Sequence, residues 1–498
     1  MGHNVNEYEL IPQTIRPSAE AKEAKEIHFE RTTTVSEDEV QLHKRLNKNQ
    51  LTAYDVIINR VFSNKAGAFF IDSPGGTEKT FLYRALLATV RSMGYIALAT
   101  ATSGVAASIL SGGRTAHSRF KIPIDIDENV SCISKQSALA SLIRDAKLIV
   151  WDEASMANKR MLEVFDLLLK DLMDTNVLFG GKVVVFGADF RQALPVVRNG
   201  KKEDFINQSL LYSSIWAKLE KIQLSENMRA KTDHAFCDFL LRIGNGQERL
   251  NATNNIEVPN SLIVPFTAER ESLDKLFTVT YPYLNSSGYE ASCTDSRVIL
   301  TTKNNCADEI NDMLIDQFPG KARIFVGIDE TIESDNQSQF EDLLHTLYPA
   351  GLPPYILSLK KNCPIMLLRN LNPYEGLCNV TRLNCCEFKT HVLSAKIAPG
   401  DFKNTHVFIP RIPLLSSNDE KLPVQFKRTQ FPVRMCFVMT INKAQGQALN
   451  FVGIYLREPV FSYGQLYVAL SRAKSSNYVK LLIRPPTPTS DDDHYTLT

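Results

Sequence analysis

The stretch SPGGTEKT, from Ser73 to Thr80, nearly matches the phosphate-binding loop pattern G-x-x-x-x-G-K-[ST]. It keeps the final Lys79 and Thr80, but Ser73 and Glu78 stand where the pattern requires glycine. In such a loop, backbone N–H groups hold the phosphates, the lysine neutralises them and the hydroxyl reaches Mg²⁺. The stretch is therefore a nucleotide site, a damaged nucleotide site or a coincidence.

An acidic pair ends an apolar run further along the chain, in LIVWDEA. Asp152 and Glu153 have an ordinary interpretation as caps of the next helix. Downstream of a phosphate loop, however, the same pair is typical of an ATPase. Asp152 would then hold the metal through water, and Glu153 would polarise the attacking water.

Three further segments carry polar groups suited to phosphate chemistry. FGADFRQALPVV places Asp189 and Gln192 just after a strand candidate, while LSENMRA and VALSRA contain Arg229 and Arg472. A single arginine is usually a solvated surface residue. Two of them in these surroundings suggest groups that stabilise charge at the γ-phosphate.

Alternating strand and helix patterns must position these groups. The apolar runs AGAFFID, YIALATAT, AKLIVWDEA and GGKVVVFGADF are typical of parallel strands covered on both faces, and FLYRALLATVRSMG is an apolar-faced helix. A second alternation contains SRVILTTKNN, NFVGIYL and YVKLLI, and the residues before its last strands alternate apolar with polar. We predict an α/β fold with parallel sheets and a small β-rich insertion.

Length and composition set broader bounds. The 498 residues exceed one ordinary domain, so about two to four domains are expected. The net charge of +1 gives no overall polyanion signal, although a basic groove can exist on a neutral protein. No apolar run is long enough to span a bilayer and no signal core is present, which favours a cytosolic or nuclear protein with reduced cysteines and no zinc site.

The order of the segments resembles the PIF-type DNA helicases, which are superfamily 1, RecD-like, 5′-to-3′ enzymes. The matching segments are LNKNQ, SPGGTEKT, ATSGVAASILSGGRTAHSRF, WDEASM, GADFRQALPVV, LSENMR, MTINKAQGQ and GQLYVALSRA. They cover roughly residues 46 to 484. GGRTAHSRFKIPIDI and LLRNLNPYEGLCN are similar in particular to the helicase module of plant Helitron transposons.

The resemblance implies two RecA-like domains, an SH3-like form for the β-rich insertion, and ATP and Mg²⁺ as cofactors. We expect a polar lead-in, either helical or flexible, and a disordered Pro- and Asp-rich tail. The expected bounds are 1–45 for the lead-in, 46–232 for the first domain, 233–375 and 431–484 for the second, 376–430 for the insertion and 485–498 for the tail.

The resemblance also implies roles for single residues. Gln50 would read adenine, Thr80 and Asp152 would hold Mg²⁺, and Gln192 would couple the γ-phosphate to DNA. The catalytic set is Lys79, Asp152, Glu153, Gln192, Arg229 and Arg472, with the two arginines as fingers from opposite sides of the cleft. The nucleotide contacts are Gln50, Pro74, Gly75, Gly76, Thr77, Glu78, Lys79 and Thr80. The contacts to single-stranded DNA are Thr115, His117, Ser118, Lys443, Gln445 and Gly446.

His117 has an alternative role as a histidine that braces the core or a loop. The small residues and hydroxyls of ATSGVAAS suit close approach to a sugar-phosphate backbone.

The chain departs from the family pattern at five positions, which are Ser73, Glu78, Ala188, Val380 and Tyr463. The first four replace glycine, which tolerates positive φ and close backbone approach; the fifth replaces histidine. Glu78 puts a charge beside the phosphates, where two unit charges about 4 Å apart repel by roughly 1 kcal/mol in water and about 4 kcal/mol at a dielectric of 20. Because a triphosphate carries several charges, we expect a loss of nucleotide affinity of about a hundredfold or more, and hypothesise a decaying transposon-type copy.

The function most consistent with the sequence is an ATP-dependent 5′-to-3′ helicase acting on single-stranded and duplex or junction DNA. The family roles are DNA repair, recombination and telomere maintenance, or Helitron-type transposition, with a monomer in the nucleus. The alternative is a catalytically impaired single-strand-binding relic. A small-molecule kinase or another phosphate-loop enzyme is disfavoured by the two arginine segments and the second α/β half.

Overall fold

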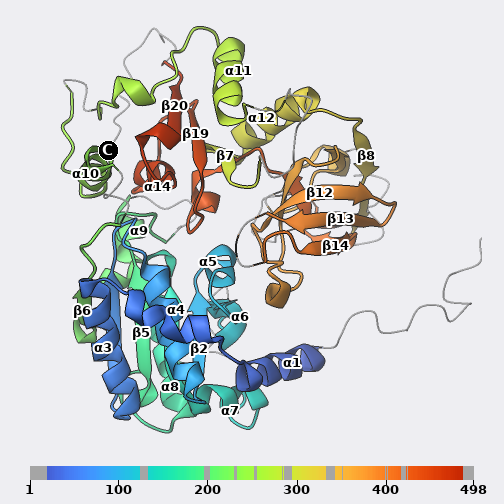
Figure 1. The fold of residues 1–498 in the computed structure, drawn as a ribbon. Coiled ribbons are helices and arrows are strands. Elements are labelled where there is room, and N and C mark those ends of the chain that lie inside the picture. The colour runs from blue at the N-terminus through green and yellow to red at the C-terminus, as the bar shows by residue number, and fades with distance from the viewer. Residues whose placement is uncertain are drawn as a thin grey trace, which may run out of the picture.

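The computed structural model describes most of the chain (Figure 1). The described residues are 19–123, 133–195, 202–228, 233–251, 255–282, 284, 294–332, 343–349, 351–398, 400, 402–416, 422 and 424–485. Figure 1 shows a blue-to-green α/β part, a second α/β part built from green, yellow and red segments, and an orange β-rich part beside the second.

A six-stranded parallel sheet, in the order β3-β2-β4-β5-β1-β6, forms the first part. Its strands are β1 (Gly67–Asp72), β2 (Ile96–Ala101), β3 (Arg114–Thr115), β4 (Ala146–Asp152), β5 (Val183–Ala188) and β6 (Glu220–Gln223). Its helices are α3 (Lys48–Phe62), α4 (Lys79–Ser92), α5 (Gly104–Ser108), α6 (Ala116–Phe120), α7 (Ala138–Asp145), α8 (Lys159–Leu172) and α9 (Lys202–Asn207).

Helices cover both faces of this sheet, which explains why its strands are continuously apolar. Along β4, Leu148 and Val150 pack with α3 and α4, whereas Ile149 and Trp151 pack with α7 and α8. The functional segments follow strands β1, β4 and β5, which lie next to one another and end at the same edge.

The second α/β part has a four-stranded parallel sheet in the order β18-β7-β19-β20. Its elements are α10 (His234–Gly244), α11 (Glu269–Thr280), β7 (Arg297–Thr301), α12 (Asn304–Gln317), β18 (Val438–Thr440), β19 (Phe451–Leu456), α14 (Gln465–Ser471) and β20 (Val479–Ile483). The predicted α/β class with two parallel-sheet parts is thus confirmed.

The β-rich part is antiparallel throughout the strands that the structure describes. A five-stranded sheet has the order β14-β13-β12-β11-β17, a three-stranded sheet has the order β15-β16-β9, and β8 pairs with β10. The strands are β8 (Arg323–Val326), β9 (Ile328–Thr331), β10 (Ile356–Leu359), β11 (Pro364–Leu367), β12 (Arg382–Phe388), β13 (Val392–Ile397), β14 (His406–Pro410), β15 (Ile412–Leu415), β16 (Phe426–Gln430) and β17 (Val433–Met435).

These strands begin before residue 376 and extend beyond residue 430, the expected bounds of the insertion. One apolar core joins them to the second α/β part, since Ile365 and Leu383 of the β-rich sheet cluster with Ile299 of β7 and Leu314 of α12. Where two parts share one apolar core, the amino-acid composition does not change at the boundary between them, so the sequence does not mark that boundary. The domain bounds and the SH3-like form of the insertion stay predictions.

The lead-in contains helices α1 (Ala19–Thr32) and α2 (Glu37–Val40). Glu30 of α1 is buried, and its carboxylate lies 2.6 Å from the Arg119 guanidinium and 3.5 Å from that of Arg91. The lead-in is therefore tied to α4 and α6 by a buried charge cluster. Residues 486–498 of the predicted tail lie outside the described residues. Within the described ranges, no helix combines the length and apolarity needed to cross a bilayer.

Candidate functional site

The loop from Ser73 to Glu78 joins β1 to α4, as the phosphate-loop pattern requires. Lys79 begins α4, and Thr80 lies half-buried in its first turn. Glu78 has the left-handed backbone φ 53°, ψ 42°, the conformation that favours glycine. Its side chain is exposed, so the carboxylate is solvated. The departure at position 78 therefore strains the backbone and places a well-hydrated charge at the end of the loop, where α4 begins.

The other departures differ in their structural consequences. Ser73 and Ala188 are buried and neither has a positive φ, so a side chain fits the backbone at both positions. Tyr463 is 48% exposed and needs no special backbone. Val380, in contrast, has φ 70°, which a β-branched residue rarely adopts. Only Glu78 and Val380 carry a conformational cost.

The predicted acidic pair lies directly against the loop lysine. Lys79 Nζ is 2.7 Å from Asp152 Oδ1, and both side chains are nearly buried. The same carboxylate oxygen accepts the Glu153 N–H at 2.8 Å. Glu153 precedes a short 3₁₀ turn but its side chain makes no cap, so the capping interpretation of the pair fails there. The pair instead surrounds the lysine.

Burial and charge set the protonation of this cluster. Burial raises the pKa of Glu153, against the opposing charge of Lys79. Burial alone would lower the pKa of Lys79, but the charges of Asp152 and Glu153 outweigh it and the pKa is raised. Lys79 is thus a fixed cation, whereas Glu153 is a carboxylate with increased proton affinity, as a general base requires.

A second buried carboxylate, Asp189, organises the other side of the loop. Asp189 follows β5 and accepts the Gly75 N–H at 3.1 Å and the Gln192 amide at 3.3 Å. Arg191 Nη1 lies 3.3 Å from the same carboxylate. Gln192, the predicted γ-phosphate contact, is therefore held close to the loop by Asp189.

The second α/β part completes this site. Tyr467 of α14 donates its hydroxyl to Asp189 Oδ2 at 2.9 Å, and Gln445 Nε2 donates to Glu153 Oε2 at 3.4 Å. Arg472 follows α14 and donates to the carbonyls of Val468 and Gln447, both at 3.1 Å. Its positive charge opposes the burial that raises the pKa of Glu153.

Arg229 lies outside the described residues. The two residues before it contact the loop, since Asn227 Nδ2 donates to the Gly75 carbonyl at 3.2 Å and the Met228 N–H donates to that of Gly76 at 3.0 Å. The segment that ends at Met228 therefore contacts the phosphate loop, and the role of Arg229 stays a prediction.

Gln50 is engaged with the loop itself. Its Oε1 accepts the Asn47 N–H at 3.1 Å in a capping box that begins α3, and its Nε2 donates to the Thr77 carbonyl at 2.9 Å. Thr77 in turn donates its hydroxyl to the Pro74 carbonyl at 3.0 Å. Gln50 braces the loop in this structure, and its contact with adenine stays a prediction.

Two of the predicted DNA-contact segments meet across the two α/β parts. Gly446 has φ 79°, and a Cβ built there would lie 3.6 Å from the Ala106 Cβ of α5. That distance is an ordinary van der Waals contact, so the two parts touch here and the positive φ is what favours glycine at position 446. Lys443, nearby in the chain, donates to Asn304 Oδ1 at 3.0 Å.

The third segment lies on α6 of the first part. The Thr115 hydroxyl accepts the Ser118 N–H at 3.4 Å and caps the helix. His117 Nδ1 is 3.0 Å from the Ile122 carbonyl, which is the loop-bracing contact named above as its alternative role. A DNA contact of these three residues remains a prediction.

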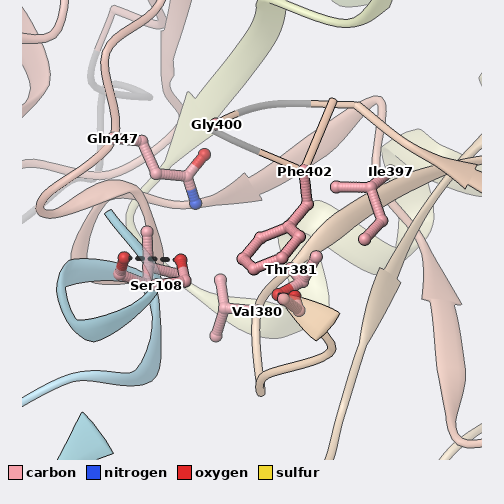
Figure 2. A pocket seen from close by; sticks show the side chains of 9 residues that line it. Ser108, Val380, Thr381, Ile397, Gly400, Phe402 and Gln447 are labelled. Atoms are coloured by element: carbon pink, nitrogen blue, oxygen red, sulfur yellow. Dashed lines mark hydrogen bonds between the residues drawn. The ribbon is translucent and has the colours of Figure 1, made fainter. Parts of the chain in front are cut away.

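A cavity of about 30 Å³ lies where α5 meets the β-rich part. Figure 2 shows the Phe402 ring pointing into it, with Val380 and Thr381 beside the ring and Ser108 of α5 across from it. A volume of this size has room for one or two water molecules and none for a nucleotide. This cavity is therefore too small to be the expected nucleotide site.

Val380 stands where the family pattern has glycine, and replacing it tests what its left-handed backbone costs in stability. Because an L-residue with a Cβ in the left-handed region costs about 1–2 kcal/mol, Val380→Gly should be more stable than Val380→Ala by about 1 kcal/mol. Both variants lose the same valine methyls, so the comparison isolates the backbone. Urea unfolding measures the difference. Equal stability of the two variants would show that position 380 is not left-handed in solution.

Several buried polar atoms around the loop have no hydrogen-bond partner among the described residues. They are Ser73 Oγ, Tyr83 Oη, Ser155 Oγ, Gln192 Oε1 and Gln445 Oε1. An unpartnered buried polar atom costs about 1–3 kcal/mol, so such a cluster fits a polar ligand. The Thr80 hydroxyl and the Asp152 carboxylate are oxygen donors of the type that Mg²⁺ prefers. The residues present thus fit a nucleotide with Mg²⁺.

Sequence reasoning missed the role of Tyr467 and noted Asp189 without assigning it one. Tyr467 lies within the GQLYVALSRA segment, in which the sequence predicts a role for Arg472 alone. No local pattern marks a tyrosine whose hydroxyl reaches another domain, because that contact depends on how the two parts face each other.

Two family models match the chain. The model for the PIF1-like helicase matches residues 45–254, and the model for the 2B domain of the DNA helicase Pif1 matches residues 342–388. The first match contains the loop, the acidic pair and Gln192, and the second lies in the β-rich part.

Curated relatives match over most of the chain. The ATP-dependent DNA helicase PIF1 of Danio rerio is 25% identical over 94% of this chain, which spans 65% of that relative. The human protein of the same name is 24% identical, and the chain spans 61% of it. The ATP-dependent DNA helicase Pif1 of Bdellovibrio bacteriovorus is 26% identical and covered over 83% of each chain.

Solved structures share the fold. The Pif1 helicase from Candida albicans has a TM-score of 0.61 and 22% identity, covering 88% of this chain and 94% of that one. Bacteroides Pif1 bound to single-stranded DNA has a TM-score of 0.62 and 20% identity, covering 88% and 92%. These likenesses support the α/β architecture described above.

Proposed function

Because the chain belongs to the PIF1-like helicase family, we propose that it is an ATP-dependent DNA helicase that couples ATP hydrolysis to movement on single-stranded DNA and to duplex unwinding. The observation that carries this proposal is the buried cluster of Lys79, Asp152 and Glu153, which a second α/β part contacts through Gln445. The named helicase relatives support the same activity.

The residues divide the chemistry among them. The loop N–H groups and Lys79 bind and neutralise the phosphates, and Glu153 takes the proton of the attacking water. Gln192 orients the terminal phosphate, and Arg472, with Arg229, adds positive charge as the domains close. Thr80 and Asp152 would hold Mg²⁺, which would supply charge stabilisation at the phosphate oxygens.

The contact between Gln445 and Glu153 suggests how DNA and ATP are coupled. Gln445 belongs to a segment expected to contact the single strand, and its amide donates to the catalytic carboxylate at 3.4 Å. A strand that moves residues 443–446 therefore changes the surroundings of Glu153. Through this contact, DNA binding would change the rate of ATP hydrolysis.

The finer assignments follow the family resemblance alone. We infer 5′-to-3′ movement on single-stranded, duplex and junction DNA by a monomer, in the nucleus, in repair, recombination, telomere maintenance or Helitron-type transposition. The chain spans about two thirds or less of the vertebrate relatives it matches. Measuring unwinding of substrates with a 5′ or a 3′ single-stranded tail tests the polarity.

The experiment that tests the function is ATP hydrolysis with and without single-stranded DNA, comparing wild type with Glu78→Gly. We expect both proteins to turn over with DNA stimulation. Since the Glu78 carboxylate is solvated, its repulsion of phosphate is about 1 kcal/mol, and Glu78→Gly should lower the KM for ATP about fivefold. This effect is smaller than the hundredfold expected from sequence.

A matched variant, Glu78→Gln, separates charge from backbone strain. It should share the lower KM of Glu78→Gly but not its gain in stability, which comes from relief of the left-handed φ of 53°. If only Glu78→Gly hydrolyses ATP, the chain is a DNA-binding relic and the proposed activity is wrong for the wild type.

A further inference from the structure

Helix α14 places the Tyr467 hydroxyl directly on the phosphate loop. The hydroxyl accepts the Gly75 N–H at 2.9 Å and donates to Asp189 Oδ2 at 2.9 Å. Tyr467 is 2% exposed, and burial raises its pKa, so the hydroxyl stays protonated and can donate. The Tyr467 hydroxyl thus connects the second α/β part to the phosphate loop through one oxygen atom.

Two glycines make room for this side chain. A Cβ on Gly75 would lie 3.2 Å from the hydroxyl, and a Cβ on Gly244 of α10 would lie 3.0 Å from the ring. Arg191 lies beside the same ring, since that Gly244 Cβ would also lie 3.0 Å from the Arg191 Cβ. The tyrosine therefore occupies a fitted space formed by both parts of the site.

The bridge is incompatible with phosphate at the same N–H. In a phosphate loop the backbone N–H groups are the donors that hold phosphate oxygens. Gly75 N–H already serves Tyr467 and Asp189, at 2.9 and 3.1 Å. A phosphate oxygen that takes this donor must displace the hydroxyl, and the Asp189 carboxylate beside it would repel the incoming charge unless it moves with the tyrosine.

We propose that Tyr467 is a positioning residue: it holds the second α/β part on the nucleotide-free loop and is released when a nucleotide phosphate takes the Gly75 N–H. The inference rests on the proposed function, because it assumes that the loop binds nucleotide. Loop occupancy is then communicated through Tyr467 to α14, the helix that Arg472 follows.

Tyr467→Phe removes the hydroxyl and keeps the ring. Since phosphate then competes for the Gly75 N–H with the Asp189 carboxylate alone, the variant should bind ADP and a non-hydrolysable ATP analogue about twofold to tenfold more tightly without DNA. Tighter binding separates this role from a merely structural one, because a loosened site would bind more weakly. Titration calorimetry gives both affinities, and Tyr478→Phe, at an exposed tyrosine, should match wild type.

Amide hydrogen exchange of residues 75–78 in nucleotide-free protein is the second measurement. These amides should exchange faster in Tyr467→Phe than in wild type, and equally in both when the analogue is bound. If wild type binds nucleotide but Tyr467→Phe binds it no more tightly, or if exchange is unchanged, the inference is overturned and the helicase proposal stands. If wild type neither binds nor hydrolyses ATP, the proposed function fails and the inference fails with it.

Discussion

Replacing Glu153 by Gln is expected to lower DNA-stimulated ATP turnover by about 10²–10⁴-fold, the contribution of a positioned general base. Glutamine keeps the size and can still accept from Gln445, but it cannot take a proton from water. Lys79 and the loop N–H groups stay in place, so the affinity for ATP should change little. Steady-state kinetics should therefore show a loss in kcat with nearly unchanged KM.

The pH profile gives an independent check on Glu153. Burial raises its pKa in the folded protein, and the base acts only when ionised. Turnover should therefore fall as the pH falls through the raised pKa, starting at a higher pH than the usual glutamate value of about 4.3 would give. Glu375→Gln, at an exposed glutamate, should retain the wild-type rate and profile. A Glu153→Gln enzyme with wild-type kcat would remove this residue from the mechanism.

The positions of these groups could be predicted from sequence because they depend on short-range rules. A strand followed by a loop and a helix places Lys79 at the sheet edge, and β4 ends at Asp152 because its apolar run ends there. Parallel neighbours bring those ends together. The partners of Glu153 and Asp189 in the second part could not be predicted in this way, because Gln445 and Tyr467 reach them only after the two parts meet.

Side chains with several possible partners were also beyond sequence reasoning. Gln50 can face a base or the loop, and the capping box with Asn47 turns it toward the Thr77 carbonyl. Glu30 lies in a lead-in whose pattern is simply polar, yet it is buried against Arg91 and Arg119. A charged helix gives no local sign of which carboxylate is covered, since the cover comes from residues 61 and 89 positions away.

The β-rich part contains a buried ion pair that shows the same limit. Arg428 of β16 and Asp329 of β9 are fully buried and joined by two hydrogen bonds, both 2.7 Å. The guanidinium also donates to the carbonyls of Leu344, Leu347 and Pro353. These partners lie 75 to 99 residues before Arg428 in the sequence. The arginine therefore links segments that are far apart in the chain.

Asp329→Ala should therefore destabilise the β-rich part by about 3–5 kcal/mol, because it leaves the buried Arg428 charge without its carboxylate. The neighbouring pair provides a matched control: Lys427 and Glu330 lie one position along the same two strands but are 40% and 52% exposed. Glu330→Ala should cost less than about 1 kcal/mol, as exposed pairs do. Urea titration followed by amide exchange in β9 and β16 measures both.

A double variant, Arg428→Met with Asp329→Leu, separates the cost of an unpaired charge from the value of the pair. Burying an ion pair sacrifices hydration of both ions, so apolar side chains of similar volume should restore most of the stability lost in Asp329→Ala. The lost bonds to Leu344 and Pro353 leave their carbonyls without this donor and set the remaining deficit. If Asp329→Ala costs no more than Glu330→Ala, Arg428 is not buried in solution and the pairing of β9 with β16 is wrong.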